Sequence, residues 1–435
     1  MSFYIICTIF TASIIICAIS GYNIIYALLI GLILFIYDGY EKGFRGRDFL
    51  KMFKSGINFA KNLIIIFLLI GILTGLWRES GTIQYLVLQG TKWINVRYFY
   101  FWAFILTAIM SIITGSCMGT ASTIGVVIAI MAKAFQMNPI ISGGALLSGI
   151  MVGDRMSPVS SSAQLVAKLS DTKVSNNLPR MLKTSIIPTL ITAMIFALII
   201  GNDVPQKGVD IISNLQASHQ ISHYSLLPAL TIIVLAIFKL DSIKLLSISS
   251  IISAAIALII KKVRLTELIK VMTFGYNSGE EALKILNGGG IYGMRVMIIT
   301  VLISAFYFGI FEKTKFMDPF KKKINKLQIS IGHFPALIIV SIILSMITCT
   351  QTLSVMMAGN LIKDTYKNKN LMAIDFENSV IVIPAIIPWN ITAGIAIEIF
   401  NVPKISIVMN LFCLILPIYY FLTRTRYKKI LNSSK

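Results

Sequence analysis

The sequence predicts an all-α membrane protein with about ten transmembrane helices and two re-entrant hairpins, arranged as an inverted repeat. Three observations support this fold class. Of the 435 residues, 56% are hydrophobic and only 13% are charged, whereas soluble domains carry about 25% charged residues. Apolar runs near the roughly 20 residues that cross a bilayer recur along the chain. The two halves also resemble each other, and polar residues interrupt both at corresponding places.

Six apolar runs approach membrane-spanning length: Phe3–Ser20, Tyr22–Tyr37, Leu63–Trp77, Ser185–Ile200, Met297–Phe311 and Ile405–Leu422. No basic residue precedes the first run and no small-residue cleavage pattern follows it, so we expect a mature helix rather than a signal peptide. The net charge of +21 fits cytoplasmic loops rich in Lys and Arg. It does not come with a basic stripe and interleaved aromatic residues, which argues against nucleic-acid binding.

The internal repeat rests on matches that follow the same order in both halves, at offsets of 219 to 234 residues, and the offset is constant from Gly75 to Thr114. Ile109–Thr114 matches Ile343–Thr348 at an offset of 234 residues, and Gly75 matches Gly309 at the same offset. Chance matches between apolar segments are the alternative, but the constant offset favours a duplication. Internal repeats of this kind are a common plan of membrane transporters.

The matches divide the chain into five parts. These are N-terminal transmembrane helices at 1–37, a first repeat at 38–200, a linker loop with two helices at 201–260, a second repeat at 261–422 and a basic cytoplasmic tail at 423–435.

Each repeat contains a candidate hairpin. In the first, apolar arms at 98–113 and 121–132 flank a polar tip at 114–120. At about 1.5 Å per residue the arms are roughly 24 and 18 Å long, which is short for two crossings. The second repeat offers an equivalent tip at 348–352. We therefore predict two re-entrant hairpins.

The charge distribution supports this topology. With the N-terminus inside and both tips re-entrant, the inside loops hold more than twice as many Lys and Arg residues as the outside loops. One single crossing per region makes the two sides nearly even, so the positive-inside rule favours hairpins with both termini in the cytoplasm. Two full crossings per region fit the charges equally well, and only the short arms argue against them. The basic outer loop 261–290 is the weak point.

A broken span follows each hairpin. The first break is predicted at 153–160 around Pro158, and the second at 386–390 around Pro388. Proline removes a backbone donor and favours a kink or break. Such backbone is tolerated at membrane depth only where protein or a water-filled cavity satisfies it. We expect the two tips and two breaks to converge near the midplane and to offer an ion its partners.

Asp154 is the central candidate residue because it lies near the middle of the predicted span 139–166. A carboxylate there costs about 2.5–3.5 kcal/mol on insertion scales, so we expect it to bind a cation or carry a proton. The alternative is a structural pair with a basic residue. Arg155 is adjacent but points elsewhere on a regular helix.

Neutral oxygens suited to a hard cation such as sodium gather at the four interruptions. The candidates are Thr114, Ser116, Ser157, Ser160, Thr348, Gln351 and Asn390. A single hydroxyl more often makes an interhelical hydrogen bond, so the prediction rests on their concentration. Four glutamates near helix ends are expected to be solvated: Glu79, Glu312, Glu377 and Glu398.

We expect no metal site apart from sodium and no cofactor. His219 and His223 stand four residues apart in a polar loop without a third ligand nearby. The five cysteines lie in or beside apolar segments, which fits packing or a pore lining better than disulfides or metal binding.

Three motifs resemble the NhaC-type sodium/proton antiporters of the ion transporter superfamily. They are Thr114–Gly125, Gly153–Ser160 with its Gly-Asp-x-Met-Ser-Pro stretch, and Ile387–Asn390. The resemblance extends over roughly residues 38–420. It implies exchange of sodium for protons, although some relatives move malate, lactate or amino acids. It also implies ion-site roles for Asp154, Ser157 and Asn390.

Three positions depart from the pattern of that family. Ser161, Thr350 and Asn378 stand where the family has carboxylates. Fewer fixed negative charges weaken cation binding or change the number of coupled protons.

The leading expectation is sodium/proton exchange by alternating access in the cell (inner) membrane, with sodium and protons as the transported species. The alternative is sodium- or proton-coupled transport of a small organic anion or amino acid, as in malate/lactate exchange, with Arg155 helping to hold a carboxylate. An intramembrane enzyme is disfavoured because the spans carry no paired catalytic carboxylates, zinc motif or Ser/His pair. The expected partners are the lipid bilayer and a small ion or solute, and a homodimer is left open.

Overall fold

A computed structural model describes residues 3–20, 22–201, 222–238, 240–279, 281–316 and 318–433. Within these ranges the chain is helical and forms no strand, and its β contact is an isolated bridge between Tyr276 and Gly288. The predicted all-α class is confirmed. His219 lies outside the described residues.

Eight helical segments in the described part of the chain are long and apolar enough to cross a membrane. They are Ile24–Glu41, Ala60–Glu79, Val96–Thr114, Cys117–Ala134, Val174–Leu198, Ser242–Ile259, Arg295–Thr314 and Lys404–Thr425. These segments overlap five of the six apolar runs found in the sequence. The chain is therefore a multi-pass membrane protein. The total of about ten crossings stays a prediction.

The elements up to the linker follow one another in short steps. They are α1 (Phe3–Ser20), α2 (Ile24–Glu41), α3 (Gly46–Glu79), α4 (Thr82–Trp93), η1 (Val96–Tyr98), α5 (Phe99–Thr114), α6 (Cys117–Thr120), η2 (Ala121–Gly125), α7 (Val126–Ala134), α8 (Pro139–Met156), α9 (Ser161–Leu169) and α10 (Val174–Leu198).

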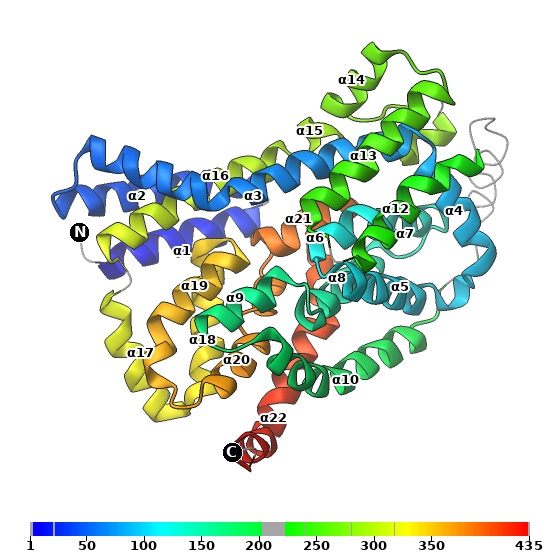
Figure 1. The fold of residues 1–435 in the computed structure, drawn as a ribbon. Helices are drawn as coiled ribbons and strands as arrows, with labels where there is room; N and C mark the ends of the chain where they lie inside the picture. The colour runs from blue at the N-terminus through cyan, green and yellow to red at the C-terminus, as the bar shows by residue number, and fades with distance from the viewer. Residues whose placement is uncertain are drawn as a thin grey trace.

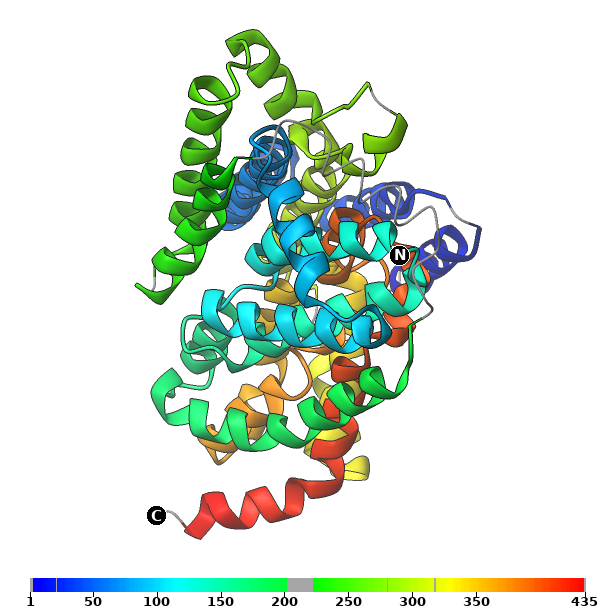
Figure 2. The same ribbon diagram turned by 90° about the vertical axis from the view of Figure 1, so that its right-hand side faces the viewer.

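The elements after the linker are η3 (His223–Leu226), α12 (Leu227–Ile237), α13 (Ser242–Ile259), α14 (Leu265–Phe274), η4 (Glu281–Leu286), α15 (Gly290–Gly293), α16 (Arg295–Thr314), α17 (Asp318–Ile331), α18 (His333–Thr348), α19 (Gln351–Ile362), η5 (Lys363–Thr365), α20 (Lys369–Glu377), η6 (Ile383–Ile386), α21 (Ile391–Phe400), η7 (Lys404–Met409) and α22 (Leu411–Ser433). Helix α22 continues through most of the predicted tail and projects from the helical body in Figure 2.

The longest helix, α3, packs along α16, and the two run side by side across the molecule (Figure 1). Glycines on both helices allow the close approach. A Cβ at Gly56 would lie 1.9 Å from the Ala305 carbonyl oxygen, and one at Gly309 would lie 2.0 Å from the Met52 carbonyl oxygen. Small residues at such interfaces let helix backbones approach within membranes.

The tightest packing around the centre of the molecule joins α5 to α8. A Cβ at Gly153 would lie 1.9 Å from the carbonyl carbon of Ser111. The Ser111 hydroxyl donates to the Ile150 carbonyl at 2.5 Å. Helix α8 is thereby fixed against α5 one residue before Asp154, and α6, α8 and α21 meet at the centre of Figure 1.

We expect Gly153→Ala to lower the thermal stability of the purified protein by about 1–3 kcal/mol, because its methyl group meets immovable backbone rather than a flexible side chain. Gly46→Ala is the matched control, since a Cβ at Gly46 meets nothing within 4 Å. Thermal unfolding in detergent followed by intrinsic fluorescence measures both. Equal melting temperatures for the two variants would show that α5 and α8 are not locked at this contact.

Candidate functional site

The polar tip of the first repeat is a two-residue interruption between α5 and α6. Gly115 adopts the left-handed conformation with φ 63°, which turns the chain directly after Thr114. The Ser116 hydroxyl then caps α6 by accepting from the backbone N–H of Gly119 at 3.1 Å. The hydroxyls of Thr114 and Thr120 lie 2.9 Å apart across the turn.

The tip of the second repeat has the same construction. Cys349 is left-handed with φ 56° and follows Thr348, the last residue of α18. Thr350 caps α19, since its hydroxyl accepts from the backbone N–H of Leu353 at 3.3 Å. The hydroxyls of Thr348 and Ser354 lie 2.8 Å apart. Every one of these residues stands 234 positions after its counterpart, so the geometry supports the duplication.

The arms beside the first tip are longer than the sequence suggested. Val96–Thr114 and Cys117–Ala134 are 19 and 18 residues long, and each is long enough to cross a membrane. Arms α18 and α19 of the second tip have 16 and 12 residues. Arm length thus favours a hairpin in the second repeat only, and both re-entrant hairpins stay predictions.

The first predicted break lies between α8 and α9 and is shorter than expected. Helix α8 continues through Gly153 and Asp154 to Met156, and the non-helical residues are 157–160. Ser160 caps α9, with its hydroxyl accepting from the backbone N–H of Ala163 at 3.4 Å. Asp154 is therefore held on a regular helix, less than one turn before its end.

The second break is longer than expected. Helix α20 ends at Glu377, and turns together with η6 fill the chain as far as Asn390. Asn390 caps α21 by accepting from the backbone N–H of Thr392 at 3.1 Å. The predicted range 386–390 thus covers only the end of the interruption.

Each tip packs against the break of its own repeat. A Cβ at Gly115 would lie 2.9 Å from the Ser157 hydroxyl oxygen, which places the first tip on the first break. In the second repeat, the backbone N–H of Ile391 donates to the Cys349 carbonyl at 2.8 Å. The Asn390 side chain also donates to the Ser345 carbonyl at 3.0 Å.

Gln351 joins the two repeats at Asp154. Its Nε2 donates to Asp154 Oδ2 at 3.0 Å and to the Ile381 carbonyl at 2.9 Å. The carboxylate is buried, with 3% of Asp154 exposed. The hydroxyls of Ser160 and Ser162 both donate to the Asp154 backbone carbonyl, Ser162 at 2.9 Å. The structure therefore brings Asp154, Ser160 and Gln351 together.

The other predicted oxygens are engaged within their own tip or cap. The Thr114, Ser116, Thr348 and Asn390 side chains hold local turns or helix starts, as described above. Ser162, which sequence reasoning missed, belongs to the Asp154 group. Its position directly after the neutral Ser161 was the available signal.

Arg155 points away from Asp154, as the helical spacing predicted. Its five N–H groups donate to five neutral acceptors: the Glu377 and Met181 carbonyls, the Ser185 and Thr184 hydroxyls, and the Asn378 side-chain oxygen. The side chain is fully buried. These bonds use all the donors of the guanidinium, so none is left for a substrate carboxylate.

The expectation that all four glutamates are solvated was wrong for Glu377. Glu312 and Glu398 are exposed and Glu79 is half-buried, but Glu377 is fully buried at the end of α20. Neither of its carboxyl oxygens has a hydrogen-bond partner among the described residues. The apolar run at 380–387, which begins three residues after Glu377, was a signal of burial that the sequence offered.

A second buried carboxylate on α20 has a structural role. Asp375 pairs with Arg424 at 2.6 Å and accepts from the hydroxyls of Tyr366 and Tyr420, each at 2.8 Å. This closed network fixes α22 against α20. It leaves Asp375 without a free oxygen for transport.

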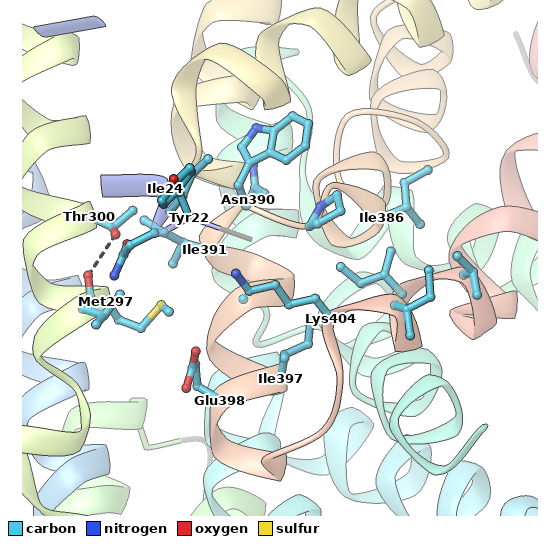
Figure 3. A pocket seen from close by; sticks show the side chains of 18 residues that line it. Tyr22, Ile24, Met297, Thr300, Ile386, Asn390, Ile391, Ile397, Glu398 and Lys404 are labelled. Atoms are coloured by element: carbon cyan, nitrogen blue, oxygen red, sulfur yellow. Dashed lines mark hydrogen bonds between the residues drawn. The ribbon is translucent and has the colours of Figure 1, made fainter. Parts of the chain in front are cut away.

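A cavity of about 620 Å³ opens beside the second break (Figure 3). Its lining includes Trp389 and Asn390 from the break, Glu398 from α21 and Lys404 from η7. Figure 3 shows Asn390, Glu398 and Lys404 along this hollow. The cavity therefore reaches Asn390, which is one of the predicted site residues.

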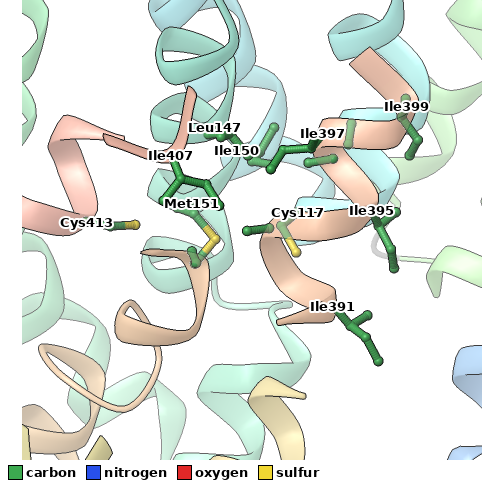
Figure 4. Close-up of a cluster of buried hydrophobic side chains, with 14 of the residues drawn as sticks. Cys117, Leu147, Ile150, Met151, Ile391, Ile395, Ile397, Ile399, Ile407 and Cys413 are labelled. Atoms are coloured by element: carbon green, nitrogen blue, oxygen red, sulfur yellow. The ribbon is translucent and has the colours of Figure 1, made fainter. Parts of the chain in front are cut away.

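An apolar cluster surrounds the part of α8 that precedes Asp154 (Figure 4). Ile150 and Met151 of α8 are buried together with Ile397 of α21 and Ile407 of η7. Cys117 belongs to the same cluster, and all five cysteines are free thiols. Asp154 is thus set at the end of an apolar helix segment, where an uncompensated charge is costly.

The described residues contain no group of three or more His, Cys, Asp or Glu side chains arranged to hold a metal ion. What they contain is one buried carboxylate held by a neutral amide, close to breaks in two helices. A multi-pass helical protein with such a site is a membrane transporter.

The comparisons identify the kind of transporter. The Na+/H+ antiporter family model matches residues 149–424, and the chain belongs to that family. It is a transporter and not an enzyme, which confirms the resemblance seen in the motifs.

Curated relatives cover most of the chain. The Na+/H+ antiporter NhaC of Bacillus subtilis is 27% identical over 84% of this chain and 83% of its own length. The malate-2H+/Na+-lactate antiporter of Bacillus subtilis is 25% identical over 84% and 81%. The arginine/ornithine antiporter ArcD of Halobacterium salinarum is 22% identical over 84% and 79%.

We expect Arg155→Gln to destabilise the protein by about 3 kcal/mol, because most of the five buried acceptors lose their donor. Lys168→Gln, which removes one positive charge from an exposed position of α9, is the matched control. The melting temperature in detergent measures both. If Arg155→Gln melted with the control and lost only transport, Arg155 would be a substrate-binding residue instead.

Proposed function

We propose that the protein exchanges sodium for protons across the cell (inner) membrane by alternating access, with Asp154 as the sodium-binding carboxylate. The single observation that carries this proposal is the environment of Asp154. Its carboxylate is buried, and its side-chain partner is the neutral amide of Gln351 rather than a basic residue. A buried carboxylate without a protein counter-ion is stabilised by a proton or by a bound cation.

The oxygens near Asp154 suit sodium. Hard cations take carboxylate, hydroxyl and carbonyl oxygens. Ser157 lies in the break directly after α8, and Gln351 approaches from the other repeat. The proposal places the ion between these groups, with the two breaks near the bilayer midplane.

The topology belongs to the same proposal. The repeats at 38–200 and 261–422 insert with opposite orientation, and both termini face the cytoplasm, where the basic loops lie. The equivalent construction of the two tips supports a duplicated unit. Rocking of one unit against the other would expose Asp154 to each side in turn.

The relatives support sodium and protons as the exchanged ions, since the NhaC protein of Bacillus subtilis carries that activity in its name. A second candidate is exchange of a small organic solute, as the names of the malate/lactate and arginine/ornithine antiporters indicate for those proteins. The observation that favours it is the cavity of about 620 Å³, which is lined by a carboxylate, Glu398, and an amine, Lys404.

We expect Asp154→Asn to abolish sodium-driven proton movement, because an amide binds neither sodium as a counter-charge nor a proton. Purified protein in liposomes receives an inside-acid pH gradient, and sodium added outside dissipates the gradient through the native protein. Glu312→Gln, which neutralises an exposed carboxylate, is the control and retains activity. Sodium-driven proton movement in Asp154→Asn at the native rate would refute the role of Asp154.

The same vesicles discriminate the two candidate functions. If the native protein responds to neither sodium nor lithium but accumulates malate, lactate or amino acids, its function is organic-solute transport and not ion exchange.

A substitution at the second tip tests the effect of the neutral positions. We expect Thr350→Asp to lower the sodium concentration for half-maximal exchange severalfold, because it adds a negative charge next to Gln351 while an aspartate still caps α19. Thr350→Ser retains the cap without the charge and serves as the control. Identical sodium dependence in both variants would place the ion away from the second tip.

A further inference from the structure

The positive charge of Arg155 is buried without a hydrogen-bonded anion. All five of its acceptors are neutral, and the side chain has no exposed surface. Arginine stays protonated in proteins. A buried cation of this kind calls for a nearby anion, because hydrogen bonds to neutral groups only partly replace its hydration.

Glu377 is the carboxyl placed to supply that anion. It ends α20, its backbone carbonyl accepts from Arg155 Nε at 3.2 Å, and its side chain interacts electrostatically with Arg155. In the described part of the chain, no donor reaches either of its carboxyl oxygens. Glu377 is thus close enough to compensate Arg155 but is not tied to it by a hydrogen bond.

Few charges act on Glu377. Within the described part of the chain, the charges that act on it are those of Arg155 and Asp154, both from α8. On α20 itself, Asp375 is occupied by Arg424 of α22.

Among the side chains that the structure describes, the other elements packed against α20 bring no further charge to Glu377. Lys168 of α9 and Lys183 of α10 are exposed, Arg180 of α10 is half-buried, and His333 of α18 faces the Thr365 carbonyl. The charges that act on Glu377 therefore come from Asp154 and Arg155, two consecutive residues of α8.

The two buried carboxyls differ in their hydrogen bonds. Asp154 accepts from the Gln351 amide, which stabilises an ionised carboxylate. Glu377 accepts from no donor, and burial without a donor favours the neutral acid over the ion. These bonds favour an ionised Asp154 and, against the pull of the Arg155 charge, a protonated Glu377.

We propose that Glu377 is a second proton-binding site of the exchange cycle, coupled to a sodium ion on Asp154. While Asp154 is ionised, its negative charge helps to retain the proton on Glu377. Sodium on Asp154 cancels that charge, and Arg155 then stabilises the Glu377 carboxylate that remains when the proton leaves to water. One sodium ion binds and one proton is released, on two different carboxyls.

This inference rests on the proposed function and goes beyond it. Asp154 supplies the sodium site in both, but the proton that sodium displaces comes from Glu377. The neutral Asn378 fits the arrangement, because its side-chain oxygen accepts from Arg155 at 2.7 Å without cancelling the charge of Arg155.

The test is sodium-induced proton release from detergent-solubilised protein, measured in weak buffer with a pH indicator. Sodium binding is followed in parallel by isotope binding. In Glu377→Gln we expect sodium binding to persist at alkaline pH. Its proton release near neutral pH falls severalfold and shifts to more acidic pH, because Asp154 alone is then left to hold the displaced proton and its hydrogen bond from Gln351 favours the ionised carboxylate.

The outcomes separate the two proposals. Native protein that releases no proton on sodium addition contradicts sodium/proton exchange itself. If the native protein releases protons and Glu377→Gln releases as many over the same pH range, Glu377 is not a proton site and the exchange proposal stands. Folded Glu377→Gln that no longer binds sodium at any pH also overturns the inference, since Asp154 is unaltered.

A second variant covers failure of Glu377→Gln to fold. Glu377→Asp keeps a carboxyl but moves it relative to Arg155, so we expect full proton release with a shifted pH midpoint. An unshifted midpoint would contradict the inference. Glu312→Gln is the control for both variants and keeps native release, because its carboxylate is exposed on α16.

Discussion

The structure depends on the requirement that backbone polar groups within a membrane find partners inside the protein. The chain interrupts its helices at four central places, and each interruption ends in a side-chain cap. Ser116, Ser160, Thr350 and Asn390 all accept from a backbone N–H at the start of the next helix. These caps hold the non-helical backbone in place, and they account for much of the polarity that the sequence concentrates there.

The caps also determine which side-chain oxygens remain free to bind an ion. Most of the hydroxyls at the interruptions already bond to neighbouring backbone, so the number of oxygens is a poor guide to the number of ligands. Asp154 differs because its carboxylate receives one side-chain hydrogen bond, from the opposite repeat. The matching construction of the two tips is therefore largely structural, whereas Asp154 and Arg155 of α8 give the site its charges.

Asp154 and Arg155 are consecutive residues of α8, and they carry opposite charges on different sides of that helix. Side chains on a helix are rotated by about 100° per residue, so Asp154 faces Gln351 whereas Arg155 faces α10 and α20. Arg155 then connects the first break to the start of the second through Glu377 and Asn378. The Glu377 carboxyl receives no hydrogen bond from the described residues and lies beside the Arg155 cation. A carboxyl in that position can gain or lose a proton as its surroundings change.

The class of the protein could be predicted from the amino-acid sequence, because apolar runs of membrane length and the charges of the loops between them are local features of the chain. The sequence also located the interruptions, since proline, glycine and hydroxyl residues have local backbone effects, and it singled out Asp154 as a charge within an apolar span. The boundaries were less well predicted. The first break begins after Met156 rather than at 153, because the helix retains its hydrogen bonds through Asp154.

The contacts between distant residues could not be predicted from the sequence and became known from the packing of the helices. Gln351 contacts Asp154 from 197 positions away, and Glu377 is buried because α20 packs among other helices. A glutamate near a helix end is usually solvated, so local pattern argued for the wrong environment. Burial and long-range pairing depend on the packing of distant segments, and that packing decides which of the carboxyls holds a charge and which holds a proton.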